Sequence, residues 1–151
     1  MFYVSVDPPR QTGVESSTLR YVDTIAHVVE VLTEQVGNAY RAFLRKLGIS
    51  YIIAGETELD HGLALSKLKE KFSIETLMLG GGGVLNWSFL QAGMCDEISI
   101  VLAAAADGSP DTPPVFRAAE GISESKALGF TLKEAKAMDG GAVWLRYGVN
   151  R

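Results

Sequence analysis

The sequence predicts an α/β fold: a mainly parallel sheet flanked by helices, with a C-terminal antiparallel hairpin. Before Gly93, the expected strands are short and apolar throughout, which is typical of strands buried on both faces of a sheet. They alternate with stretches whose apolar residues recur at helical spacing, as in parallel sheets built from right-handed strand–helix–strand units. After Gly93 the helical spacing stops, and strand patterns separated by turn residues indicate the antiparallel part.

Two strands are expected in the N-terminal part, at residues 2–6 and 27–33. Between them, from Asp7 to about Thr24, the chain is polar and contains two prolines. So long a stretch without periodicity is uncommon inside a compact domain and favours a lid or an excursion loop. A surface linker without a role is the alternative.

Two helices separated by a strand at 51–54 follow. Asn38 can cap the first helix, Gly48 ends it, and Asp60 can cap the second. Their apolar faces are formed by Tyr40, Phe43, Leu44 and Leu47 in the first helix and by Leu65, Leu68 and Phe72 in the second.

A third apolar strand is expected at 76–79, directly before a third helix that ends at Gly93. The inner side of this helix is formed by Leu85, Phe89 and Ala92. Further strands are expected at 98–104, 130–137 and 143–147, with a hairpin turn at Asp139-Gly140-Gly141 before the last. No internal repeat is visible, and we expect a single domain over residues 1–151.

The composition excludes several classes of protein. The 14 Lys and Arg against 18 Asp and Glu give a net charge of −4, which argues against a nucleic-acid binder because phosphate contacts need a basic face. No apolar run reaches the roughly 20 residues of a membrane span, and no secretion signal opens the chain. Cys95 is the only cysteine, so neither an internal disulfide nor a thiolate metal cluster can form. We therefore expect a cytoplasmic protein without a metal.

The strongest functional signal is the run of four glycines from Gly80 to Gly83, between an expected strand and an expected helix. Glycines let backbone N–H groups approach a ligand without an obstructing Cβ atom, and they adopt positive φ freely. The N-terminus of the helix adds unsatisfied donors and a partial positive charge. The pattern predicts a phosphate or pyrophosphate site, with a tight turn that merely needs glycine as the alternative. It matches neither the Rossmann nor the Walker fingerprint.

The glycine run and its surroundings also resemble a known family. The residues from Gly80 to Leu90 include Leu-Asn and Ser-Phe-Leu, and those from Ala92 to Ser99 include Ala-Gly and Asp-Glu. Further matching segments are 30–34, 48–55 and the Ala-Asp-Gly turn at 106–108. Together they resemble the reductase domain of the bifunctional riboflavin-biosynthesis deaminase–reductases, the RibD C-terminal domain, which is a relative of dihydrofolate reductase.

The resemblance implies a dihydrofolate reductase-like fold and an NADPH-dependent reductase. Hydride would pass to a pyrimidine- or pterin-like substrate, as in 5-amino-6-(5-phosphoribosylamino)uracil reductase. By the same similarity, the cofactor-binding residues are Thr33, Gly81, Gly82, Gly83 and Val84.

Gly81, Gly82, Gly83 and Val84 would present their backbone to the pyrophosphate. Thr33 would lie beside the adenosine end, where the carboxyl ends of parallel strands also place ligands. A strand-terminal Thr that caps a turn is the alternative. Glu34 beside it would repel the 2′-phosphate of NADPH unless its side chain points away, so NADH stays open.

The chain departs from the family in two ways. Gly80 stands where the riboflavin reductases usually have a Glu, so the carboxylate that would help to bind a ribityl or ribosyl substrate is absent. Family members also begin with a strand and a helix that precede anything found here, so we expect an N-terminally truncated domain. Because that section carries most of the substrate side, the resemblance assigns no catalytic residue.

A non-catalytic nucleotide-binding or dimerisation module derived from this family is the second hypothesis. A homodimer would form through apolar residues of the antiparallel edge, which are Phe130, Leu132, Val143, Trp144 and Leu145. A third hypothesis, a flavodoxin-like phosphate binder, is disfavoured by the antiparallel finish.

The remaining chemical candidates are weak. His27 and His61 are far apart in sequence and show no metal-ligand spacing. Asp96 and Glu97 are adjacent on an expected strand and therefore point to opposite faces, which favours capping and sheet hydrogen bonds over an acid pair. Trp87 would stack on a ligand ring or, more often, pack its helix against a neighbour.

Overall fold

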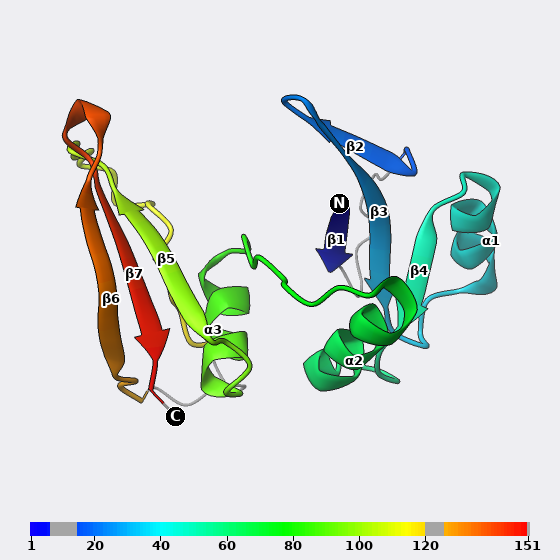
Figure 1. Cartoon of the computed structure of the whole chain (residues 1–151). Helices are drawn as coiled ribbons and strands as arrows, with labels where there is room; N and C mark the ends of the chain where they lie inside the picture. The colour runs from blue at the N-terminus through cyan, green and yellow to red at the C-terminus, as the bar shows by residue number, and fades with distance from the viewer. Residues whose placement is uncertain (7–14, 120–125, 151) are drawn as a thin grey trace. The chain divides into compact units, whose positions relative to one another are not determined.

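The computed structural model describes residues 1–6, 15–119 and 126–150. The contacts within the chain group it into two compact units, Met1–Leu77 and Met78–Arg151, each with its own sheet (Figure 1). Helices and strands occur in both units, so the α/β class is confirmed. That the chain forms one domain stays a prediction.

The first unit contains a four-stranded mixed sheet whose central strand is β3. The strands are β1 (Phe2–Val6), β2 (Thr18–Tyr21), β3 (Thr24–Leu32) and β4 (Ser50–Ile53). β3 runs parallel to β1 and β4 and antiparallel to β2. Its residue His27 pairs with β1 and β2, and Val29 pairs with β1 and β4, so β2 and β4 share one edge of β3.

Three strands of this sheet were predicted, and β2 was not. It lies in the polar stretch that was expected to be a lid or a linker, part of which, residues 7–14, lies outside the described residues. The sequence Thr-Leu-Arg-Tyr is too short and too polar to show strand periodicity by itself. It forms a strand because the first half of β3 offers it a free edge.

The core of the first unit lies on both faces of β3, because alternate residues of a strand point to opposite sides. Val29 and Val31 pack with Leu68 of α2 (His61–Phe72). Val28 and Leu32 pack in a second cluster with residues of α1 (Asn38–Lys46). Each buried Val or Leu contributes about 1.5–3 kcal/mol to stability. The predicted burial of this sheet on both faces is therefore confirmed for β3. The predicted mainly parallel sheet is shown only in part, because β1 and β4 pair parallel with β3 while β2 pairs antiparallel.

The two helices of this unit begin differently. In α2, the Oδ1 atom of Asp60 accepts a hydrogen bond of 2.9 Å from the backbone N–H of Leu63, which confirms the predicted cap. In α1, the prediction that Asn38 is the cap was wrong, because Asn38 is the first helical residue and Gly37 occupies the cap position without a side-chain bond. Gly48, with φ of 68°, ends α1 as predicted.

The apolar face of α1 is only partly buried. Leu44 is fully buried, and Tyr40 and Leu47 pack against the second core cluster. Phe43 stacks on Tyr40 with ring centroids 6.0 Å apart, but 44% of its surface stays exposed.

The strand predicted at residues 76–79 is not formed. Residues 73–82 belong to no helix and pair with no strand among the described residues, and Met78 is 91% exposed. Local apolarity predicted a strand here, but a strand also needs a hydrogen-bonded neighbour. The described residues of neither unit supply one, and the segment crosses the boundary between the two units.

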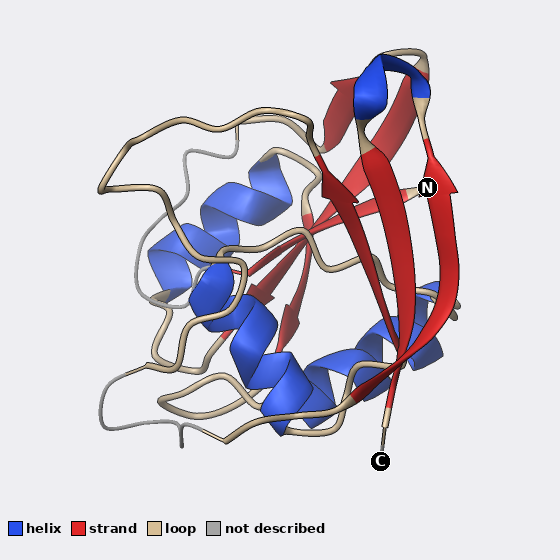
Figure 2. Cartoon of the chain, turned by 90° about the vertical axis from the view of Figure 1, so that its left-hand side faces the viewer, coloured by secondary structure: helices blue, strands red, loops and turns tan. Residues whose placement is uncertain are grey.

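The second unit contains one helix and an antiparallel sheet in the order β5-β7-β6 (Figure 1). Figure 2 draws helices in blue and strands in red. Its elements are α3 (Gly83–Gln91), β5 (Glu97–Leu102), β6 (Phe130–Ala137) and β7 (Val143–Val149). The three predicted strands are confirmed. The turn between the last two is a short 3-10 helix, Asp139–Gly141, with φ of 80° at Gly140.

The third helix ends as predicted at Gly93, which has φ of 67°. Phe89 is buried on its inner side, and Leu85 is partly buried. Ala92 was wrongly placed on that side, because it is the exposed residue that follows the last helical turn. None of the helices in the described part of the chain is long and apolar enough to cross a membrane.

Loss of the α2 cap is expected to destabilise the chain. Asp60→Ala removes the acceptor for the Leu63 amide, and the unfolding free energy from a urea titration should fall by about 1 kcal/mol. Asp60→Ser, which keeps a capping oxygen, is the control and should lose much less. Equal loss in both variants would contradict the capping role.

Candidate functional site

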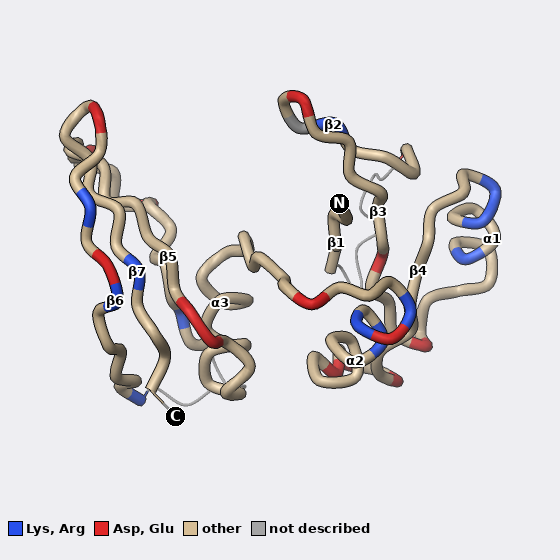
Figure 3. The backbone as a smooth tube through the Cα atoms, viewed as in Figure 1, with Lys and Arg blue, Asp and Glu red and all other residues tan. Residues whose placement is uncertain are grey.

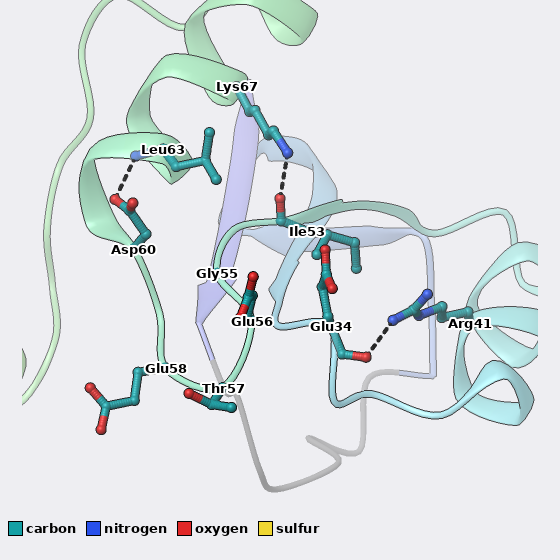
Figure 4. Close-up of a pocket in the computed structure, with 10 residues that line it drawn as sticks. All are labelled: Glu34, Arg41, Ile53, Gly55, Glu56, Thr57, Glu58, Asp60, Leu63 and Lys67. Carbon is teal, nitrogen blue, oxygen red and sulfur yellow. Dashed lines mark hydrogen bonds between the residues drawn. The ribbon is translucent and has the colours of Figure 1, made fainter.

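A pocket of about 840 Å³ lies in the first unit at the carboxyl ends of β3 and β4 (Figure 4). It is lined by Glu34, Arg41, Ile53, Gly55, Glu56, Thr57, Glu58, Asp60, Leu63 and Lys67. Ligands of open α/β sheets bind in the crevice outside the carboxyl ends of parallel strands. The position of this pocket is therefore the one that the fold favours for a ligand.

Backbone hydrogen bonds hold the two turns that form the pocket. The N–H of Ala54 donates to the carbonyl of Leu32 over 2.7 Å, and the N–H of Glu34 donates to the carbonyl of Gly55 over 3.0 Å. Gly55 has φ of 113°, and a Cβ atom there would collide with the carbonyl oxygen of Glu58. Only glycine fits this turn, so its shape depends on Gly55.

Carboxylates outnumber cations in the pocket by two to one. Glu34, Glu56, Glu58 and Asp60 line it together with Arg41 and Lys67, and acidic residues gather in the turns after β3 and β4 (Figure 3).

Both cations of the pocket donate to backbone carbonyls, as the dashed lines in Figure 4 show. Nη2 of Arg41 donates to Glu34 over 2.8 Å, and Nζ of Lys67 donates to Ile53 over 2.7 Å. The Nε atom of Arg41 is buried without a hydrogen-bond partner among the described residues. The pocket therefore has negative character, and its cations are held by the fold.

Thr33, predicted at the adenosine end of the cofactor, directly follows β3. Its side chain is completely buried, and its Oγ1 atom has no hydrogen-bond partner among the described residues. The next residue, Glu34, is exposed and lines the pocket. A cofactor contact of Thr33 stays a prediction.

The predicted glycine turn lies in the second unit and leads into α3. Gly82 occupies the cap position of this helix with φ of −67° and ψ of 170°. None of the four glycines has a positive φ, so left-handed backbone is not the reason for glycine here. Their conformations are open to any residue, and the reason for glycine must be space.

The four glycines form two pairs that differ in the space available for a Cβ atom. A Cβ atom on Gly81 would collide with the side chain of Leu85. On Gly83 it would lie 2.5 Å from the carbonyl oxygen of Pro114 and 3.2 Å from the backbone nitrogen of Arg117. At Gly80 and Gly82 nothing lies within 4 Å. Packing therefore explains one pair, and the other pair faces open space.

A strap formed by residues 114–117 packs beside the first turn of α3. The N–H of Arg117 donates to the carbonyl of Gly83 over 3.0 Å, and Nδ2 of Asn86 donates to the carbonyl of Val115 over 3.0 Å. The first amides of a helix have no partner within it, and Gly82 offers no side-chain cap. The start of α3 therefore has the donors and the adjoining space that an anion needs.

The two histidines have different surroundings. His27 Nε2 lies 2.9 Å from Ser50 Oγ, and its ring meets Phe2 edge-on. Burial lowers the pKa of His61, and the nearby Asp60 carboxylate partly offsets this. Among the described residues, no group of three or more His, Cys, Asp or Glu could hold a metal ion.

Glu97 belongs to an ion network on one face of the second sheet. Its carboxylate accepts from Arg146 Nε over 2.7 Å and Nη2 over 3.0 Å, and from Lys133 Nζ over 3.1 Å. Arg146 also donates to Glu134 over 3.1 Å. Hydrogen bonds from Arg146 and Lys133 lower the pKa of Glu97 to about 2. The Glu97 side chain thus forms ion pairs across the strands instead of the capping and sheet hydrogen bonds that were predicted.

The residues predicted to form a dimer edge do not share one face. The register places Phe130 and Leu132 on the same face as Val143 and Leu145. Trp144 points to the other face, where its Nε1 atom donates to Ser99 Oγ over 2.8 Å, so the five residues do not form one surface. Trp144 differs from Val143 and Leu145 because successive side chains of a strand point to opposite faces of the sheet. Dimerisation itself stays a prediction.

Trp87 of α3 is partly buried, and its Nε1 atom is buried without a hydrogen-bond partner among the described residues. Stacking on a ligand ring stays a prediction for this residue.

Comparison with protein families gives a match over most of the chain. Residues 11–144 match the family model described as the RibD C-terminal domain. The chain is 35% identical over 85 residues to the 2,5-diamino-6-ribosylamino-4(3H)-pyrimidinone 5′-phosphate reductase of Methanothermobacter thermautotrophicus, covering 56% of this chain and 38% of that protein. The reductase of the same name from Aquifex aeolicus is 26% identical over 103 residues, covering 68% and 45%. The chain thus spans less than half the length of these relatives.

Solved structures share the fold. A pyrimidine reductase-like protein of Corynebacterium diphtheriae superposes with a TM-score of 0.66 at 18% identity, covering 82% of this chain and 50% of that one. RibD of Acinetobacter baumannii superposes with a TM-score of 0.65 at 18% identity, covering 88% and 42%. At these identities the similarity shows the fold, and the predicted dihydrofolate reductase-like class is confirmed.

The two pairs of glycines predict different responses to an added methyl group. Gly83→Ala should lower the free energy of unfolding by about 1–3 kcal/mol, because the strap must move away from the new Cβ atom. Gly82→Ala, its control, should cost less than about 1 kcal/mol, mainly as a poorer helix cap. Urea titrations of both variants measure this. Equal losses would contradict the packing role of Gly83.

The ion network predicts a pH-dependent contribution to stability. The folded-state pKa of Glu97, about 2, lies below its usual value of 4.5, so its contribution is present above pH 4.5 and disappears as the pH falls toward 2. Glu97→Gln should therefore lower the urea midpoint at pH 7, and its difference from the unmodified chain should shrink between pH 4.5 and 2. Glu75→Gln, at an exposed position, is the control. A difference that stays constant over this range would contradict the network's role.

Proposed function

The chain belongs to the RibD C-terminal domain family, and on this premise we propose that it is a reductase. It transfers hydride from a reduced nicotinamide dinucleotide to a pyrimidine- or pterin-like substrate. The family resemblance implies NADPH as this dinucleotide, with NADH left open. The observation that carries the proposal is the open start of α3, which lies within the family match and has free space in front of Gly82.

The residues at the start of α3 fit a dinucleotide pyrophosphate. The amides of Gly83 and Val84 are the donors, and the helix dipole favours the negative charge. Gly82 has no side chain to occupy the approach, and the first turn of the helix contains no acidic residue that would repel an anion. We assign the pyrophosphate contacts to the backbone of Gly81, Gly82, Gly83 and Val84.

The pocket at the ends of β3 and β4 is the proposed position of the adenosine end. It lies where the crevice rule puts a nucleotide, and its volume of about 840 Å³ falls in the usual range for ligand pockets. Thr33 directly precedes the pocket residue Glu34 at the end of β3 and is the proposed contact of that strand. The buried hydroxyl group of Thr33 has no hydrogen-bond partner among the described residues, which suits a contact that forms on binding.

The cofactor supplies the hydride, and the protein binds and orients it against the substrate ring. The two curated relatives are named as reductases of 2,5-diamino-6-ribosylamino-4(3H)-pyrimidinone 5′-phosphate, so this compound is the first substrate to assay. Gly80, in the position of the family's Glu, faces open space and offers no carboxylate to a ribosyl group. A homodimer through the face that carries Leu132 and Leu145 is part of the proposal.

Gly82→Val tests the pyrophosphate assignment directly. Nothing lies within 4 Å of a Cβ atom added at Gly82, so we expect the variant to stay folded, and thermal unfolding checks this. Dinucleotide affinity, followed by fluorescence titration with NADH and NADPH, should fall at least about tenfold because the backbone approach is blocked. Gly80→Val, which also points into open space, is the matched control and should bind normally. Unchanged affinity in Gly82→Val would reject the assignment.

Turnover distinguishes the reductase from a non-catalytic nucleotide-binding module. The chain is incubated with NADPH or NADH and the pyrimidinone phosphate, and the loss of reduced nicotinamide is followed by absorbance. Oxidation that depends on the substrate supports the reductase. Tight dinucleotide binding without any turnover would favour the non-catalytic alternative.

A further inference from the structure

We infer that the pocket at the ends of β3 and β4 selects a ribose with a free 2′-hydroxyl group, so that the chain binds NADH in preference to NADPH. This inference rests on the proposed function, which assigns the adenosine end of a dinucleotide to this pocket. It differs from the NADPH that the family resemblance implies. The argument comes from the charges that line the pocket and from what holds them.

The first step is the residue that follows the central strand. In dinucleotide-binding α/β folds, an acidic residue near the ribose accepts a hydrogen bond from the 2′-hydroxyl group of NAD, whereas an Arg accommodates the 2′-phosphate of NADP. Glu34 is exposed, follows β3 after Thr33 and lines the pocket (Figure 4). Glu56, in the turn after β4, adds a second carboxylate. Both are hydrogen-bond acceptors for a hydroxyl group and both repel a phosphate.

The second step concerns the hydrogen bonds that the two cations of the pocket already make. Arg41 and Lys67 are the basic residues of the lining, and each already donates to a backbone carbonyl of a pocket turn. Arg41 holds the turn at Glu34, and Lys67 holds the end of β4 at Ile53. Each cation keeps further N–H donors, among them the Nε of Arg41, but a movement toward a 2′-phosphate would strain or break its bond to the carbonyl. A carbonyl left unpaired costs free energy that offsets the gain.

The third step is the start of α2, whose cap residue Asp60 and first-turn residue Leu63 line this pocket. Such a terminus is a natural phosphate site. Here the Asp60 carboxylate already occupies it, because its Oδ1 atom accepts from the amide of Leu63. A phosphate would meet a negative charge instead of free donors. Each of the three steps favours a neutral ribose hydroxyl group over a phosphate.

The size of the preference follows from the charge of the phosphate. A monoester phosphate has a charge between about −1.5 and −2 at neutral pH. A carboxylate a few ångströms away, at the dielectric constant of a protein surface, changes the affinity by about tenfold or more. Because the pocket is open to solvent, added salt should reduce this difference.

The experiment measures binding and does not depend on turnover. The 151-residue chain is titrated with NADH and with NADPH at low and at high salt, and affinity is read from ligand fluorescence or from calorimetry. We expect NADH to bind at least about tenfold more tightly at low salt, with a smaller ratio at high salt. The same titrations are made on Glu34→Gln and on the double variant with Glu56→Gln. Both variants should bind NADPH more tightly than the unmodified chain does, so the ratio of the NADH affinity to the NADPH affinity should fall.

Glu70→Gln is the matched control. This exposed residue of α2 lies outside the pocket lining, and its replacement removes the same charge from the same unit. It should leave the ratio of the two affinities unchanged. Thermal unfolding of all variants checks that each is folded under the conditions of the titration.

The outcomes separate this inference from the proposed function. If NADPH binds as tightly as NADH or more tightly, the selectivity is overturned and the proposed function stands. If NADH is preferred but Glu34→Gln and the double variant leave the ratio unchanged, its assignment to this pocket is overturned. If neither dinucleotide binds, the proposed function fails and the inference fails with it.

Discussion

The first unit depends on the burial of β3 on both faces and its pairing along both edges. Residues of α1 pack on one face and residues of α2 on the other, so alternate side chains of the strand belong to separate core clusters. Parallel pairing with β4 brings the carboxyl ends of the two strands to the same edge of the sheet. The turns that follow them are then joined by backbone hydrogen bonds, which form the wall of the pocket. The position of the candidate site is thus a consequence of the central strand.

The glycine run of the second unit meets two separate requirements. Gly81 and Gly83 are needed because a Leu side chain and the backbone of the strap lie where a Cβ atom would be. Gly80 and Gly82 have no such neighbour, and the space beside Gly82 adjoins the free amides of a helix start. Four glycines in a row therefore combine a packing need with an open approach. Only the second of these concerns a ligand.

The two candidate binding elements differ in how they would act on charge. At the start of α3 the donors are backbone amides, which attract the pyrophosphate that NADH and NADPH have in common. In the pocket of the first unit the ionisable groups are side chains, and carboxylates predominate. Backbone donors provide affinity for a dinucleotide as a class. Side chains such as Glu34 are positioned to distinguish NADH from NADPH.

The sequence by itself determined what depends on local patterns: the α/β class, most strands, the Asp60 cap, the glycine stops of the helices and the family. Tertiary structure decided whatever needs a partner distant in the chain. An apolar segment at 76–79 remained unpaired, and the polar segment that became β2 found the free edge of β3. The sequence also could not show that Gly83 packs against the strap. Nor could it show that Arg41 and Lys67 donate to backbone carbonyls. Hydrogen-bond partners and the space that neighbouring atoms occupy are properties of the folded chain, so the spacing of residues in the sequence cannot predict them.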